Sequence, residues 1–267
     1  MNGHSRRTLG TALVLVTMIV GGVAADSKSG WWKPVLLDNE FSTLVTADAK
    51  TIGDTLAKGK PDKKGVAKAR AAALMVAAYA QGAMAKDGAK APELSALRDN
   101  AVAVAQAIKD DKFDEAKKIA ADIKVAGKGG SSAKPDAVAV EKQFDLKELM
   151  SQFKPDAAGG ISLERNLTKF WNKRGTAPFK EAELKEVLPL LLRTAVIAQV
   201  TEAMAPTADE GKKTREAWVK WSKEMGELAE EAAKQARQAK PDDKVLKSAL
   251  KKLEGNCAAC HAVFRTE

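Results

Sequence analysis

The feature that most restricts the fold of this chain is an apolar stripe near its C-terminus. The stripe advances by three or four residues at a time through Leu246, Leu250, Leu253, Cys257, Cys260 and Phe264. That spacing returns to one face of an α-helix at every turn. Helix-forming Ala, Leu, Lys and Glu dominate the rest of the chain, aromatic residues make up only 5% of it, and no stretch alternates as a strand does. The sequence therefore predicts an all-α protein with no β-strand.

Both cysteines of the chain lie in this stripe, next to one of its two histidines, as Cys257-Ala258-Ala259-Cys260-His261. Cys-x-x-Cys-His is the pattern in which two thiols bond to haem and the adjacent imidazole binds its iron. Residues three and four apart are neighbours on a helix, so the three side chains share a face and can hold one flat macrocycle. We therefore expect one covalent haem c, attached through Cys257 and Cys260, with His261 as the proximal iron ligand.

Other interpretations of the motif explain less of it. A thioredoxin-like dithiol would follow a strand and open a helix, whereas these cysteines lie several turns inside a helical pattern. A zinc site takes four ligands as a rule, and the only other histidine is His4, near the N-terminus. Two buried cysteines beside an unrelated histidine are the remaining alternative, because free cysteine packs like a small apolar residue.

Residues 1–25 have the pattern of a secretory signal peptide. Arg6 and Arg7 precede an apolar run over 9–25 that ends in Val23-Ala24-Ala25, a small-residue cleavage site. We expect the mature protein to be periplasmic or secreted. A retained membrane anchor is the alternative, although the run falls a little short of the roughly 20 residues of a spanning helix. His4 would leave with the signal, which excludes bis-histidine ligation within one chain.

The strongest break in the helical pattern is rich in Gly, Ser and Pro, and we place a linker over residues 127–140. Residues 26–126 then contain four helical patterns, over 41–56, 66–84, 94–108 and 113–125. Residues 141–267 contain patterns over 144–153, 163–171, 176–204 and 218–236, and a last one that Asp242 can cap. Short connections favour two antiparallel four-helix bundles in tandem. Only the second holds cysteines, so the first is expected to be free of haem.

A bundle whose last helix carries Cys-x-x-Cys-His followed by Phe264-Arg265 resembles cytochrome c prime and the related cytochrome c-556 type. The resemblance covers roughly residues 141–267. It implies a covalently bound haem, His261 as the proximal ligand, and Arg265 near the haem edge or propionates. An exposed cation at a helix end explains Arg265 equally well. Proteins of this family often pair, so the resemblance also implies that a homodimer can form.

The ligand on the other side of the iron separates the candidate functions. In c-556-like proteins a methionine of the first helix binds the iron, whereas in cytochrome c prime an apolar residue leaves that side open. Met150 stands in the matching place, and a core-packing methionine is the alternative; Met204 and Met225 are weaker candidates. A bound methionine implies one-electron transfer. An open side implies reversible binding of a small gas such as nitric oxide or carbon monoxide.

Charge and composition restrict the partners. The formal net charge of +9 comes from lysines on both halves of the chain, which would steer an acidic redox partner. These lysines alternate with acidic residues, which argues against nucleic-acid binding by an exported protein. The mature sequence offers no phosphate-binding loop and no histidine free to act as a general base, so we expect no enzyme activity. A further hypothesis treats the first bundle as an interaction or assembly module.

Overall fold

The structure is a computed structural model that describes residues 32–57, 59–86, 91–123, 139–155, 160–172 and 177–265. Within these ranges it is all-helical, and the only pairing of strand type is an isolated bridge between Glu210 and Lys213. The all-α prediction is confirmed. The proposed signal peptide and most of the proposed linker, residues 127–138, lie outside the described residues. No helix in the described ranges is long and apolar enough to cross a membrane.

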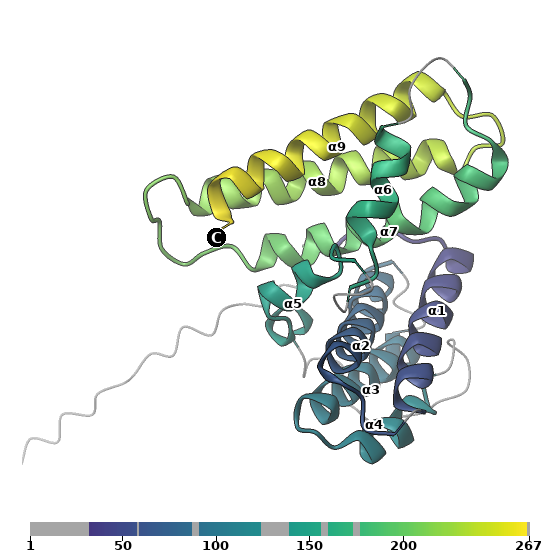
Figure 1. The fold of residues 1–267 in the computed structure, drawn as a ribbon, viewed down its shortest axis with the longest axis vertical. Coiled ribbons are helices and arrows are strands. Elements are labelled where there is room, and N and C mark those ends of the chain that lie inside the picture. Colours follow the sequence, from purple (N-terminus) through teal and green to yellow (C-terminus); the bar gives the residue numbers. More distant parts are fainter. Residues whose placement is uncertain are drawn as a thin grey trace, which may run out of the picture.

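The N-terminal group contains α1 (Asp38–Leu56), α2 (Lys63–Met84), α3 (Ala91–Lys109) and α4 (Phe113–Ala120). Helices α1 and α3 each pack against both α2 and α4, and successive helices run antiparallel (Figure 1). The Asp62 side chain caps α2 by accepting a hydrogen bond from the Gly65 N–H at 2.7 Å. The four expected helices are present. Helix α4 ends at Ala120, earlier than the pattern over 113–125 suggested.

The C-terminal group contains α6 (Leu163–Trp171), α7 (Glu181–Ala203), α8 (Arg215–Ala236) and α9 (Asp243–Phe264). Helix α8 lies between α7 and α9, and the short α6 touches both α7 and α9 (Figure 1). Small residues bring α7 and α8 close together, because a Cβ at Gly226 would lie 3.3 Å from that of Ala198. The helices expected over 163–171 and 218–236 and the one capped by Asp242 are confirmed.

The segment between the groups forms η3 (Val140–Gln143), a 3-10 turn, and α5 (Leu146–Ser151). Helix α5 is shorter than the helix expected over 144–153, because the chain turns back on itself before α6. The carbonyl of Gln152 accepts the N–H groups of both Ile161 and Leu163, at 3.3 Å each. A Cβ at Gly160 would overlap the carbonyl oxygens of Ser151 and Lys154. Only glycine fits this tight turn.

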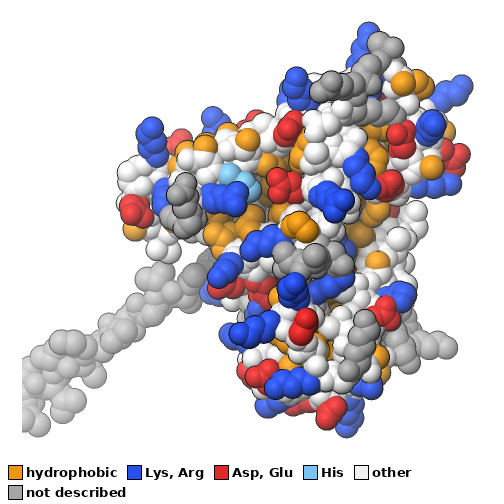
Figure 2. Space-filling model, in the orientation of Figure 1, with side chains coloured by type: hydrophobic (Ala, Val, Ile, Leu, Met, Phe, Trp, Pro, Cys, Tyr) orange, Lys and Arg blue, Asp and Glu red, His pale blue; other side chains and the backbone are white. Residues whose placement is uncertain are grey.

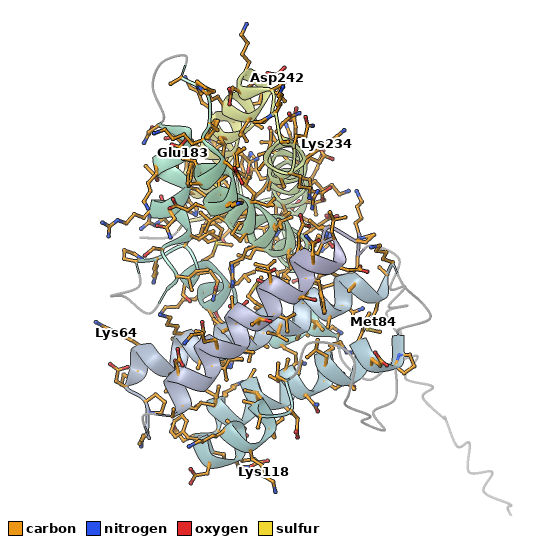
Figure 3. All side chains as sticks on the ribbon, turned by 90° about the vertical axis from the view of Figure 1, so that its right-hand side faces the viewer. Lys64, Met84, Lys118, Glu183, Lys234 and Asp242 are labelled. Atoms are coloured by element: carbon orange, nitrogen blue, oxygen red, sulfur yellow. The ribbon has the colours of Figure 1, made fainter. Side chains whose placement is uncertain are left out.

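The two groups share a buried contact along α7, whose residues 191–201 are all buried. Arg193 of α7 binds the Asp48 carboxylate of α1 at 2.9 Å. Arg237, just after α8, binds the Glu40 carboxylate at 2.7 and 2.8 Å. Figure 3 shows the two groups from the side, with Glu183 and Asp242 in the C-terminal group and Lys118 at the opposite end of the molecule.

Candidate haem-attachment site

Helix α9, which carries the motif, is held by a capped N-terminus and a buried apolar face. The Asp242 side chain accepts hydrogen bonds from the N–H groups of Lys244 and Val245, at 2.9 and 3.1 Å, which confirms it as the N-cap. Leu246, Leu250 and Leu253 are fully buried. The predicted stripe is therefore the inward face of α9, and it leads directly into the motif.

The three motif residues lie on the last two turns of α9. Cys257 is half-buried and packs against the hydrophobic core, Cys260 is half-buried, and His261 is exposed. Both cysteines are free thiols. The structure thus brings the two sulfurs and the imidazole together on the same short stretch of helix, with the sulfurs nearer the core and the imidazole nearer the surface.

Burial decides the protonation state of the two sulfurs. Burial, with smaller contributions from the nearby Cys260 and Glu164, raises the pKa of Cys257 to about 12. Burial also raises the pKa of Cys260. Glu164 lies in the first turn of α6, which places the start of α6 beside Cys257. The folded chain keeps both sulfurs as neutral thiols, which suits contact with an apolar ring.

The surface around the imidazole suits a macrocycle that is apolar with acidic edges. Figure 2 shows the histidine side chain, in pale blue, bordered by hydrophobic side chains, with lysine and arginine side chains around them. His261 is the only histidine among the residues that the structure describes. Arg265 is exposed one turn beyond it, and its N–H donates to the His261 carbonyl at 3.1 Å. Two thiols, an imidazole, apolar surface and nearby cations together fit a covalently held haem.

An aromatic cluster anchors the end of α9. The ring of Phe264 lies edge-on to Trp218 and Trp221 of α8, with centroids 4.9 and 5.7 Å apart and interplanar angles of 87°. Trp218 is 7% exposed. Its indole N–H donates to the Thr201 carbonyl at 2.5 Å. The two tryptophans therefore pack against the end of the motif helix.

The predicted distal ligand lies in a different setting. Met150 is half-buried on α5, a short helix that contacts α2 of the N-terminal group. Arg70 of α2 forms an ion pair with Glu148, and it donates to the Gln143 carbonyl at 3.2 Å. Arg70 thereby holds both η3 and α5. The role of Met150 at the iron stays a prediction.

The two weaker methionine candidates differ in their exposure to solvent. Met225 is 8% exposed in the core of the C-terminal group. Met204, at the end of α7, lines an open groove of about 760 Å³. The other residues that line this groove are Glu141, Lys142, Glu202, Ala203, Arg215 and Val219.

Sequence reasoning singled out neither Arg70 nor Thr201. Arg70 is separated from Glu148 by 78 positions, so no local pattern links the two residues. Thr201 acts through its backbone carbonyl, which every residue has. Comparison with known proteins yields no match for this chain among protein-family models, curated proteins or solved structures.

Proposed function

We propose that this chain is an exported c-type cytochrome that carries out one-electron transfer. It would bind a single haem through thioether bonds from Cys257 and Cys260, with His261 as the proximal iron ligand. The observation that carries the proposal is the position of the motif on the last two turns of α9. There Cys257 adjoins the core while the imidazole of His261 adjoins an apolar surface.

Haem, when bound, supplies a redox centre that accepts and releases one electron. The chain supplies the rest. Two attachment points on one helix face would fix the orientation of the ring, and His261 would give an imidazole nitrogen donor next to them. Leu253 and Phe264, one turn to either side of the motif, would shield the attachment points from water. Arg265 would offer a charge that compensates a propionate.

The architecture that goes with this proposal is two four-helix bundles in tandem, α1–α4 and α6–α9. The second is proposed to resemble the bundle of cytochrome c prime. The N-terminal bundle is proposed to be free of haem, since it contains no cysteine. It would pack against the haem-bearing bundle along α7.

A direct test is extraction of the purified protein with acidified acetone, followed by mass measurement. One haem mass should remain on the polypeptide. Replacing both cysteines with serine should abolish attachment, while Cys257→Ser and Cys260→Ser alone should each retain one bond and serve as matched controls. Haem that extracts freely from the unaltered protein, or two haems per chain, would contradict the proposal.

Binding of a small gas is the second candidate function, and the attachment of α5 to α2 favours it. If Met150 is not a ligand, the iron would have an open side that favours neutral diatomics such as carbon monoxide and nitric oxide. The optical spectrum separates the two functions, because low-spin six-coordinate iron and high-spin five-coordinate iron absorb differently. A spectral shift when carbon monoxide is added to the reduced protein supports gas binding, and an unchanged spectrum opposes it.

Export and the charge of the chain complete the proposal. Residues 1–25 would direct the protein to the periplasm or the exterior, and the N-terminal sequence of the purified protein would show whether cleavage follows Ala25.

The lysine excess would guide an acidic redox partner. Electron-transfer rates with such a partner should then fall as ionic strength rises. A rate that is independent of salt would remove this part of the proposal.

A further inference from the structure

The final turn of α9 is anchored by side chains that lie outside the haem motif. Phe264 is three residues after His261, and it meets both Trp218 and Trp221 in the edge-to-face geometry that makes aromatic contacts attractive. Trp218 and Trp221 are three residues apart on one face of α8. They form an aromatic wall against which the end of α9 rests.

Trp218 is itself held by the end of another helix. Its indole N–H donates to the Thr201 carbonyl at 2.5 Å, and the Met204 N–H donates to the same carbonyl at 3.0 Å. Thr201 lies in the last turn of α7, where carbonyls lack the N–H partners that continue a helix. One side chain of α8 thus joins the end of α7 to the end of α9.

The anchor acts on the part of α9 that is most prone to open. The Arg265 N–H donates to the His261 carbonyl at 3.1 Å, and this bond closes the final turn of the helix. Helix ends fray when nothing holds their last residues. Phe264 lies inside this turn, so its contact with Trp218 restrains the backbone of His261 as well.

We propose that Trp218 is a positioning residue for His261. By fixing Phe264 against the end of α7, Trp218 sets the backbone position, and through it the direction, of the imidazole. The consequence for the iron rests on the proposed haem function. The restraint on the end of α9 does not depend on that function, and it holds for the chain without haem.

The test compares Trp218→Phe with Trp171→Phe. The first substitution keeps an aromatic ring but deletes the N–H that binds Thr201. The second deletes the indole N–H of Trp171, a buried nitrogen with no hydrogen-bond partner in the described structure. Hydrogen exchange at the Arg265 amide should become about 3- to 10-fold faster in Trp218→Phe, as expected for loss of one hydrogen bond. Trp171→Phe should leave that exchange rate unchanged.

A second readout concerns the haem-loaded protein. In Trp218→Phe, the magnetic resonances of the His261 ring and the midpoint potential should shift, while both stay fixed in Trp171→Phe. If neither variant changes these properties or the Arg265 exchange rate, or if both variants change them equally, the proposal is overturned. Should Trp218→Phe fail to fold, Phe264→Leu takes its place, because it removes the aromatic contact and leaves the bond to Thr201. A protein that binds no haem would end the proposed function but would leave the exchange experiment valid.

Discussion

Arg193 of α7 and Asp48 of α1 form an ion pair, with 2.9 Å between Nη2 and Oδ1 and side chains only 8% and 4% exposed. The pair joins the helices that would carry haem to those that would not. Burial raises the pKa of Asp48, and Arg193 opposes that increase. A second oxygen of Asp48 and a second nitrogen of Arg193 lack hydrogen-bond partners in the described structure. This junction is therefore sensitive to any change in charge.

Asp48→Ala should destabilise the whole protein by about 3–5 kcal/mol, because it leaves the Arg193 cation buried without a partner. The double substitution Asp48→Leu with Arg193→Met should regain most of that loss, since well-packed apolar residues replace buried ion pairs at little cost. Denaturant unfolding followed by circular dichroism measures both effects.

The exposed pair of Lys50 and Asp54 provides the control for this prediction. The two side chains are 73% and 62% exposed, and the Lys50 Nζ lies 2.5 Å from the Asp54 Oδ2. Asp54→Ala should change the free energy of unfolding by less than about 1 kcal/mol. Equal effects of Asp48→Ala and Asp54→Ala would show that the buried pair does not join the two groups.

Tyr79, the single tyrosine of the chain, should report on the same junction through its ionisation. Burial raises the pKa of Tyr79 well above 10; the charge of Arg193 lowers it, and Asp48 raises it again. The pKa of Tyr79 is higher in the folded state than in the unfolded state. The contribution of the neutral Tyr79 side chain to folding stability is therefore complete below about pH 10 and is lost as the pH rises above it. Phenolate absorbance should therefore appear together with the loss of helical circular dichroism.

Tyr79→Phe tests that interpretation, since it removes the ionisation while keeping the ring beside Arg193. The variant should lose less stability than the unaltered protein between neutral pH and the alkaline range. A phenolate that forms near pH 10 while the helices remain intact would contradict the prediction.

The fragment 26–126 should be helical and show no Soret absorption, because both cysteines lie in the other half. It should also unfold at lower denaturant concentration than the full chain, because Asp48 and Glu40 lose Arg193 and Arg237. Circular dichroism and absorbance test both points. A fragment without helix would mean that the N-terminal group depends on α7 for folding.

Met150→Leu distinguishes the two proposed functions. The swap nearly conserves volume and should cost less than about 1.5 kcal/mol of packing. If the thioether binds iron, the variant changes from a low-spin to a high-spin spectrum and gains affinity for carbon monoxide. Met84→Leu, on half-buried Met84 of α2, is the matched control and should leave the spectrum unaltered. An unchanged spectrum in Met150→Leu would remove Met150 as a ligand.

The helices and the motif were predictable from the sequence because both depend on local spacing. The stripe through Leu246, Leu250 and Leu253 is buried as its period indicated, and Asp242 caps α9 as its position before the stripe indicated. The placement of Cys257, Cys260 and His261 on one stretch of helix follows from their separation alone, since helix geometry fixes neighbours three and four residues apart.

Only the tertiary structure decided which helices meet. The sequence places the segment with Met150 in the second bundle, and only the structure shows that Arg70 of α2 binds this segment through Glu148 and Gln143. Likewise, the Trp218 indole donates a hydrogen bond to the carbonyl of Thr201, and Arg193 forms an ion pair with Asp48, which is 145 positions away. These choices depend on how buried surfaces and charges from distant parts of the chain match one another, and no periodicity within a segment records that match.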